Sequence, residues 1–144
     1  LVLKSFGKFF GLAGVRLGFA VGHAEITAKL GAMLGPWAVP GAGLHVGAKA
    51  MSDITWINRT RDTARKEAGE LRALLSEHGF GDVGHTDLFV TVSHSDTRAV
   101  AQGLARHKIL VRTFDYAKTW MRFGLPGDEA AFTRLRTALP SIER

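Results

Sequence analysis

Lys8 stands between a hydroxyl and a guanidinium in the N-terminal part of the chain, and the three side chains have types that could do chemistry together. Glycines and aromatic residues flank Lys8, and no acid beside it would hold its amine protonated. Only a neutral amine can form a Schiff base with a carbonyl carbon. Ser5 precedes Lys8 by three residues and Arg16 follows it by eight, and a hydroxyl with a guanidinium can hold a phosphate dianion. The residue types and spacing would suit a nucleophilic lysine beside an anion site, but without further information they favour a surface lysine and a structural arginine.

The distribution of charge and glycine favours an anionic small ligand. The 144 residues carry a formal net charge of +6, with 46% hydrophobic residues and 17 glycines. Residues 1–52 hold five lysines and arginines against one acid, together with ten of the glycines. Such a segment offers a ligand close backbone approach and cationic partners. An arginine cluster with interleaved aromatic residues is missing, so we expect no nucleic acid as a partner.

Several other catalytic motifs are missing from the sequence. The chain has no cysteine, which excludes disulfides, thiol catalysis and thiolate metal sites. Gly7-Lys8 lacks the earlier glycine and the following Ser or Thr of a phosphate-binding loop, and Gly41-Ala42-Gly43 lacks the third glycine of the dinucleotide fingerprint. The six histidines lack metal-ligand spacing, so we expect no metal site.

Short apolar segments and helical periodicity organise the first half of the chain around Lys8. The expected elements are strands at 2–6 and 16–21, and helices at 24–34, 41–51 and 53–79. We expect the two strands to lie in one buried sheet, with Lys8 at a strand end. Asp53 is expected to cap the long helix and Gly79 to end it. The apolar face expected on this helix consists of Ile54, Ile57, Ala64, Ala68, Leu71, Leu74 and Leu75.

The second half alternates strand and helix signals, which predicts a small α/β lobe. The expected elements are strands at 88–92, 109–112 and 120–123, and helices at 97–107 and 128–139. Asp128 stands in the first turn of the last helix, where a negative charge is favoured. We therefore expect an α/β chain of three parts: residues 1–52 with the first sheet, a linking helix at 53–79 and a small α/β domain at 80–144.

The lysine segment reads Ser5-Phe6-Gly7-Lys8-Phe9-Phe10-Gly11-Leu12-Ala13-Gly14-Val15-Arg16-Leu17-Gly18. This run resembles the lysine segment of fold-type I pyridoxal-phosphate enzymes, the aminotransferase class I and II superfamily. The resemblance implies that Lys8 binds the cofactor, pyridoxal 5′-phosphate, covalently, and that Ser5 and Arg16 bind its phosphate. It also implies that residues 1–52 are the C-terminal remnant of a large cofactor-binding domain, which precedes the linking helix and a small C-terminal domain.

Within the superfamily, the chain looks most like the threonine-phosphate decarboxylase branch, which is close to the histidinol-phosphate aminotransferases. The segments that carry this likeness, besides the lysine segment, are Gly35-Pro36-Trp37-Ala38-Val39 and Trp120-Met121-Arg122-Phe123-Gly124-Leu125-Pro126-Gly127. Arg122 matches the strand arginine that grips the substrate α-carboxylate in this superfamily; a solvent-facing strand arginine is the alternative. Arg112 is a weaker candidate for the anionic groups of the substrate.

The branch implies a lyase that decarboxylates L-threonine O-3-phosphate, a small phosphorylated amino acid, in cobalamin biosynthesis. A histidinol-phosphate-type aminotransferase is the alternative, because both activities share these motifs. A ligand-binding relative that has lost the chemistry is a third hypothesis.

The chain begins without methionine inside an apolar run, which predicts a truncated chain without a targeting segment. The longest uncharged stretch, residues 30–48, holds five glycines and two prolines and is poor material for a membrane span, so we expect a soluble, cytoplasmic protein. The family supplies an aspartate and a stacking aromatic residue from an N-terminal portion, so this chain alone should be inactive and aggregation-prone. The family also implies a homodimer; residues 30–46 are our candidate for part of that contact, with packing against the large domain as the alternative.

Overall fold

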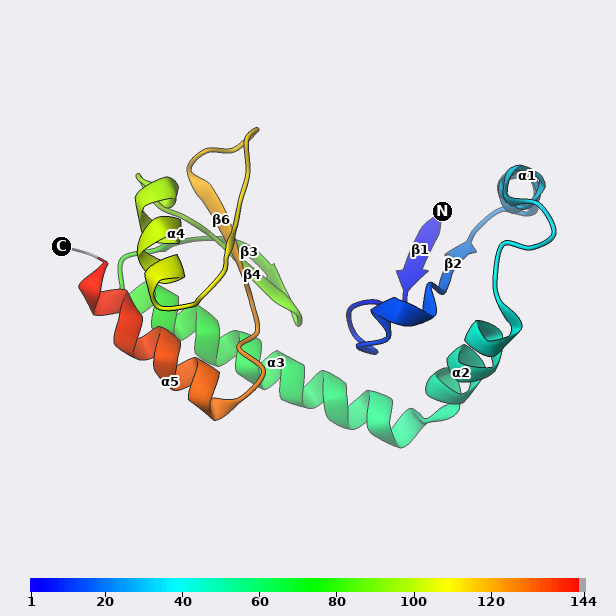
Figure 1. Cartoon of the computed structure of the whole chain (residues 1–144), viewed down its shortest axis with the longest axis horizontal. Helices are drawn as coiled ribbons and strands as arrows, with labels where there is room; N and C mark the ends of the chain where they lie inside the picture. Colours follow the sequence, from blue (N-terminus) through cyan, green and yellow to red (C-terminus); the bar gives the residue numbers. More distant parts are fainter. Residues whose placement is uncertain (143–144) are drawn as a thin grey trace. The chain divides into compact units, whose positions relative to one another are not determined.

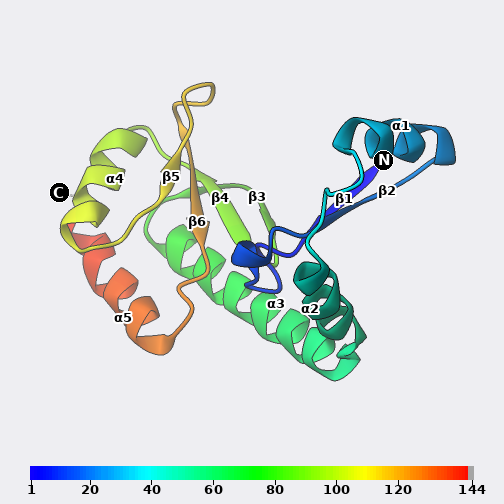
Figure 2. The ribbon, with the colours of Figure 1, turned by 45° about the vertical axis from the view of Figure 1, so that its right-hand side comes forward.

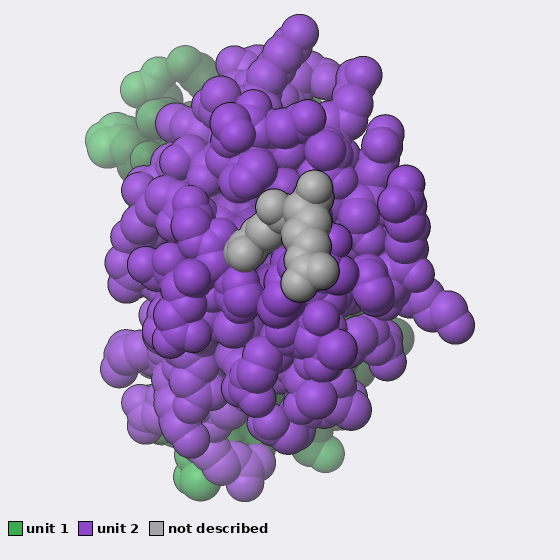
Figure 3. Space-filling view, turned by 90° about the vertical axis from the view of Figure 1, so that its left-hand side faces the viewer, with its two compact units in different colours: residues 1–58 green, residues 59–144 purple. Residues whose placement is uncertain are grey.

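The computed structural model describes residues 1–142 and divides the chain into two compact units. The first unit comprises residues 1–58 and the second begins at Arg59, so the border falls inside one long helix. Figure 1 labels the helices and strands, and Figure 3 colours the two units.

The first unit opens with a two-stranded antiparallel hairpin, visible in Figure 2. Strand β1 (Val2–Ser5) pairs with β2 (Gly18–Val21) so that Ser5 lies opposite Gly18. The expected strands therefore exist and share one sheet. The expectation that this sheet is buried is wrong for this chain, because every residue of both strands is exposed. The hairpin has no further strand and no helix layer over these residues within the unit.

Two helices follow the hairpin close to where the sequence predicts them. Helix α1 (Ala24–Leu34) begins after His23, whose ring accepts a hydrogen bond from the Glu25 backbone N–H. Helix α2 (Gly41–Ser52) begins directly after Pro40, which has no N–H to leave unpaired. These helices confirm the predictions at 24–34 and 41–51 to within one residue.

Helix α3 (Ile54–Glu77) confirms the expected long helix. The Asp53 carboxylate accepts a hydrogen bond from the Trp56 N–H at 2.9 Å, and Gly79 ends the helix region with a φ of +76°. The expected apolar face is buried except at Ile54, which is 59% exposed. That assignment was wrong because the first turn of α3 projects Ile54 into solvent, whereas Ile57 is buried.

The second unit contains a four-stranded antiparallel sheet in the order β3-β4-β6-β5. Its strands are β3 (Gly81–Thr86), β4 (Phe89–Ser93), β5 (Arg112–Thr113) and β6 (Trp120–Gly124). The sequence did not predict β3, whose glycines and polar residues lack a strand pattern and whose pairing contains an irregularity between Asp82 and Gly84. The strand expected at 109–112 corresponds to β5, which is only two residues long and begins at Arg112. Only Arg112 and Thr113 pair with β6.

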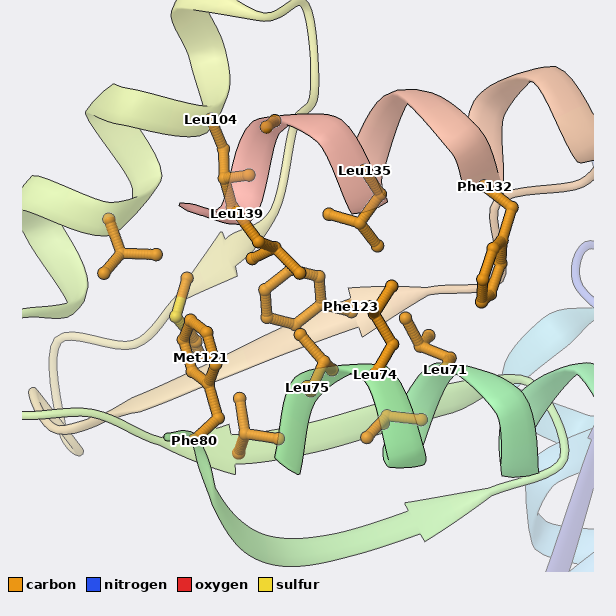
Figure 4. Close-up of a cluster of buried hydrophobic side chains, with 14 residues drawn as sticks. Leu71, Leu74, Leu75, Phe80, Leu104, Met121, Phe123, Phe132, Leu135 and Leu139 are labelled. Carbon is orange, nitrogen blue, oxygen red and sulfur yellow. The ribbon is translucent and has the colours of Figure 1, made fainter. Parts of the chain in front are cut away.

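Helices α3, α4 (Thr97–Arg106) and α5 (Glu129–Ala138) cover one face of this sheet (Figure 4). Helices α4 and α5 are capped by Asp96 and Asp128, and a short 3-10 turn, η2 (Leu139–Ser141), follows α5. The side chains of α3, α4, α5 and the inner face of the sheet point toward one another in Figure 4. This core comprises Leu71, Leu74, Leu75, Phe80, Val90, Val92, Val100, Leu104, Met121, Phe123, Phe132, Leu135, Ala138 and Leu139.

Burial alternates along the two central strands of the sheet. In β4 the residues Val90 and Val92 are buried, and in β6 the residues Met121 and Phe123 are buried. Because side chains alternate between the two faces of a strand, Phe89 and Arg122 project from the face opposite the core. The helices therefore leave the outer face of the sheet free to carry polar chemistry.

Among the residues that the structure describes, no helix is both long and apolar enough to cross a membrane.

Candidate functional site

The loop that carries Lys8 is closed at its base by main-chain hydrogen bonds. The Phe6 N–H donates to the Leu17 carbonyl at 3.2 Å, which extends the β1–β2 pairing beyond Ser5. Inside the loop, the Leu12 N–H donates to the Phe6 carbonyl at 2.9 Å. The chain therefore folds back on itself and brings the backbones of Ser5 and Arg16 to the same end of the hairpin.

Lys8 lies at an exposed position of this loop, three residues beyond the end of β1. Its carbonyl accepts a hydrogen bond from the Gly11 N–H at 2.9 Å, which tightens the turn after it. The expectation that Lys8 sits at a strand end is therefore wrong. The apolar surroundings expected around its amine are not provided by residues 1–142, where Lys8 is open to solvent.

Ser5 and Arg16 each use part of their hydrogen-bonding capacity within the loop. The Ser5 hydroxyl oxygen accepts from the Gly7 N–H at 3.1 Å, so the hydroxyl hydrogen can still be donated. The Arg16 guanidinium donates to the Ala13 carbonyl at 3.1 Å, which leaves its other N–H groups for an anion.

Arg16 also has an unusual backbone conformation. It follows the 3-10 turn η1 (Ala13–Val15) with φ 54° and ψ 40°, in the left-handed region. A residue with a Cβ atom is strained in this region, and such strain clusters where a ligand is bound. The loop therefore holds Arg16 in a conformation that costs free energy.

No hydrogen bond joins Ser5, Lys8 and Arg16 to one another within residues 1–142. What the loop carries is a set of donors, namely an amine, a hydroxyl and a guanidinium on a segment of twelve residues. This set fits pyridoxal 5′-phosphate, because the aldehyde needs an amine and the phosphate dianion needs cationic and hydroxyl donors.

Helix α2 supports the segment around Arg16 through two buried glycines. A Cβ atom at Gly43 would lie 3.3 Å from the Val15 carbonyl oxygen, and one at Gly47 would clash with the Leu17 side chain. The two glycines are four residues apart, so they share one face of the helix. This face packs against the residues on either side of Arg16 and fixes the backbone there.

Stacked aromatic rings anchor the same loop. Phe6 is 2% exposed, and its ring stacks on Phe10 with centroids 4.7 Å apart. The Phe10 ring in turn stacks on Trp56 of α3 at 5.7 Å. The aromatic residues that flank Lys8 in the sequence therefore pack against the helices of the first unit rather than around the lysine amine.

The two substrate-binding candidates, Arg112 and Arg122, lie directly opposite each other on β5 and β6. Cross-strand partners project from the same face of a sheet, so both guanidiniums lie on the outer face. Within the described residues neither arginine has a carboxylate partner. Two like charges in this arrangement destabilise a sheet unless an anion lies near them, so the pair is suited to an anionic ligand.

An open groove of about 550 Å³ contains both arginines. It is lined by Phe89, Leu110, Val111, Arg112, Thr113, Arg122 and Gly124. The Arg122 guanidinium lies over the Phe89 ring, 4.2 Å from its centroid, and the Arg112 guanidinium lies 5.7 Å from that of Phe114. Sequence reasoning missed Phe89. The period-two burial pattern of β4 could have placed it on the outer face, but only the strand register places it beside Arg122.

Comparisons with known proteins agree with the sequence motifs. A family model described as aminotransferase class I and II matches residues 1–139. A threonine-phosphate decarboxylase of Sinorhizobium sp is 43% identical over 99% of this chain and 42% of its own length. Another, of Pseudomonas aeruginosa, is 42% identical over 96% of this chain and 42% of its own length. A histidinol-phosphate aminotransferase of Symbiobacterium thermophilum is 32% identical over 88% of this chain and 34% of its own length.

Solved structures share the fold. The histidinol-phosphate aminotransferase of Clostridium acetobutylicum matches 98% of this chain and 45% of its own with a TM-score of 0.85 and 22% identity. The N-succinyldiaminopimelate aminotransferase of Mycobacterium tuberculosis matches 97% of this chain and 41% of its own with a TM-score of 0.73 and 20% identity. These matches confirm the expected α/β fold class. The chain spans less than half the length of the relatives and structures that it matches.

Proposed function

The chain belongs to the aminotransferase class I and II family, whose members are pyridoxal-phosphate enzymes, and we propose that the whole protein is a threonine-phosphate decarboxylase. The proposed reaction converts L-threonine O-3-phosphate into (R)-1-aminopropan-2-ol phosphate and carbon dioxide, as a step of cobalamin biosynthesis. The observation that carries the proposal is the high identity to two decarboxylases along nearly the whole chain, which exceeds the identity to the histidinol-phosphate aminotransferases.

The β1–β2 loop would bind the cofactor. Lys8 supplies the amine for covalent attachment, and Ser5 and Arg16 donate hydrogen bonds to the phosphate. When bound, pyridoxal 5′-phosphate supplies an electron sink for the bond that breaks at the substrate α-carbon. The exposure of Lys8 in this chain is consistent with an amine that is covered by the remaining part of the protein.

The outer face of the second sheet would bind the substrate. Arg122 holds the α-carboxylate by a bidentate contact, and its cross-strand partner Arg112 is available for the substrate phosphate. The orientation of the carboxylate decides whether the α-carbon loses carbon dioxide or a proton. In the decarboxylase, the bond to the carboxylate breaks, carbon dioxide leaves and a proton takes its place on the α-carbon. The Lys8 amine is the group of this chain that can carry a proton to or from that carbon.

Assay of the full-length protein separates the decarboxylase from the alternative aminotransferase. We expect release of carbon dioxide from L-threonine O-3-phosphate without any keto-acid acceptor. Strict dependence on 2-oxoglutarate, with transfer of the amino group, would instead assign the protein to the aminotransferases.

Lys8→Ala tests the covalent role of the lysine. In the full-length protein, borohydride reduction of the wild type should attach the cofactor to the peptide that contains Lys8, and mass mapping should locate it there. The Lys8→Ala protein should carry no reduced adduct and should lose nearly all turnover. Lys4→Ala is the matched control, since Lys4 lies in β1 on the same hairpin and should keep both. An adduct on another lysine would contradict the assignment.

We infer the domain organisation, the cellular location and the oligomeric state of the whole protein from its family. We propose that residues 1–52 belong to the cofactor domain, 53–79 form the linking helix and 80–144 form the small domain. We also propose a cytoplasmic homodimer, with residues 30–46 as part of the subunit contact. The support for these proposals comes from family membership and, for the contact, from exposed apolar side chains such as Trp37, which is 93% exposed.

A further inference from the structure

The guanidinium of Arg122 lies over the ring of Phe89. The guanidinium carbon lies 4.2 Å from the ring centroid, nearer than the Arg112 guanidinium lies to Phe114 (5.7 Å) or the Arg136 guanidinium to Phe132 (5.0 Å). A cation this close to an aromatic face is attracted by the ring quadrupole. Contact with the ring restricts where the long arginine side chain can go.

The register of β4 and β6 places Phe89 and Arg122 close together on the sheet. Arg122 lies opposite Thr91, and Phe89 is two residues before Thr91 on the same strand. Phe89 and Arg122 are therefore diagonal neighbours on the outer face, a spacing that aromatic and long side chains can bridge. Gly124 lies directly opposite Phe89, so the position across from the ring carries no side chain, and Phe89 and Arg122 line the same groove.

The geometry leaves the hydrogen-bonding edge of Arg122 available. The ring covers one side of the planar guanidinium but accepts none of its strong hydrogen bonds. No carboxylate within residues 59–142 pairs with the group either. A guanidinium supported in this way keeps its donors in a fixed fork, which is the arrangement that binds a carboxylate at two points.

We propose that Phe89 is a positioning residue for Arg122, which holds the guanidinium in the orientation that receives the α-carboxylate of an amino-acid substrate. This inference rests on the proposed substrate role of Arg122. Phe89 would then affect substrate binding only through the contact between Arg122 and the substrate carboxylate.

Steady-state kinetics of the full-length holoenzyme test the proposal with Phe89→Leu and Phe89→Tyr. Phe89→Leu should raise the KM for L-threonine O-3-phosphate about tenfold, which corresponds to about 1.4 kcal/mol, with a smaller change in kcat. Phe89→Tyr should restore a KM within about twofold of the wild type, because it keeps an aromatic face below the arginine.

The reaction product gives a readout that a merely structural role would not move. The product has an amine and a phosphate but no carboxylate. Its inhibition constant should therefore be the same for Phe89→Leu and the wild type. A parallel rise in the KM of the substrate and the inhibition constant of the product would overturn the proposal, as would an unchanged KM.

Phe132→Leu is the matched control. Phe132 in α5 also lies under an arginine, with the Arg136 guanidinium 5.0 Å from its ring centroid, and it does not line the groove. This variant should lower the melting temperature, because Phe132 is 8% exposed and belongs to the core, but should leave the KM unchanged. An equal rise in KM for both variants would show that Phe89 acts through stability and would overturn the proposal.

Failure of the decarboxylase assignment is distinguishable from failure of this inference. If the wild type transaminates instead, the decarboxylase proposal fails. The same variants are then compared by the KM for the amino donor, whose carboxylate Arg122 would still bind. A selective rise for Phe89→Leu supports the role of Phe89 in that case, and no rise overturns it.

Discussion

Arg16 has spare hydrogen-bond donors and an unusual backbone conformation. Its guanidinium has spare donors after the contact with Ala13, and its backbone is held at φ 54°. A left-handed conformation costs a residue with a Cβ atom roughly 1–2 kcal/mol, so glycine would be favoured here for stability alone. We therefore expect the Arg16 side chain to have a role at this position that offsets this cost.

Arg16→Gly and Arg16→Ala separate the role of the side chain from that of the backbone. Both variants of the full-length protein should lose cofactor affinity by at least about tenfold, because each removes a charge-assisted contact worth about 1.5–3 kcal/mol. Arg16→Gly should unfold at a higher temperature than Arg16→Ala, because glycine adopts positive φ without strain. Cofactor titration and thermal unfolding of the apoprotein measure the two effects. Full cofactor affinity in either variant would remove Arg16 from the site.

Among the elements, α2 determines where the residues around Arg16 lie. Gly43 and Gly47 are the buried residues of this helix, and each faces a neighbour of Arg16. The absence of side chains lets the helix backbone approach the loop closely, which a larger residue at either position would prevent. The helix therefore supports the segment that carries the proposed anion site.

Gly47→Val tests this support, with Gly41→Val as the matched control. A Cβ atom at Gly47 would meet Leu17 and approach Phe6 at 3.7 Å, whereas one at Gly41 has nothing within 4 Å. In the full-length protein, Gly47→Val should cost about 1–3 kcal/mol of unfolding free energy and should weaken cofactor binding. Gly41→Val should change neither by much. Chemical denaturation and cofactor titration give the comparison, and equal behaviour of the two variants would refute the role of α2.

At the scale of the whole molecule, the first unit has many exposed large apolar side chains and only a few buried ones. Leu3, Met33 and Trp37 are 74%, 83% and 93% exposed, and β1 has a strand partner on one edge only. Large exposed apolar patches mark interaction surfaces, and an unpaired strand edge invites further pairing. The chain spans 42% of the length of two threonine-phosphate decarboxylases that it matches, and we expect the whole protein to cover this surface.

Residues 1–144 expressed alone should therefore behave differently from the full-length protein. We expect the isolated chain to bind a hydrophobic dye, to associate as its concentration rises and to show no turnover with added pyridoxal 5′-phosphate. Light scattering, dye fluorescence and the carbon dioxide assay check the three expectations. Turnover by the isolated chain, or a monomer that does not bind the dye, would contradict them.

The sequence alone determined the elements whose signals are local. Asp53 was predicted to cap a helix, and its carboxylate accepts the expected backbone hydrogen bond. Asp128 was predicted in the first turn of the last helix; it lies one position earlier, where its carboxylate caps the helix. The lysine segment predicted the family, since a motif is a property of consecutive residues, and the family model confirms it. The roles of Ser5, Lys8 and Arg16 stay predictions until the variants are measured.

Only the tertiary structure decided features that depend on register and packing. Strand β3 forms because β4 offers it a partner, although its own residues favour no strand. The pairing of Arg112 with Arg122, and the ring of Phe89 beneath the latter, depend on which residues of β4, β5 and β6 face each other. A shift of one residue would send each side chain to the other face of the sheet. Such register is set by contacts between residues far apart in the chain, which local sequence patterns do not record.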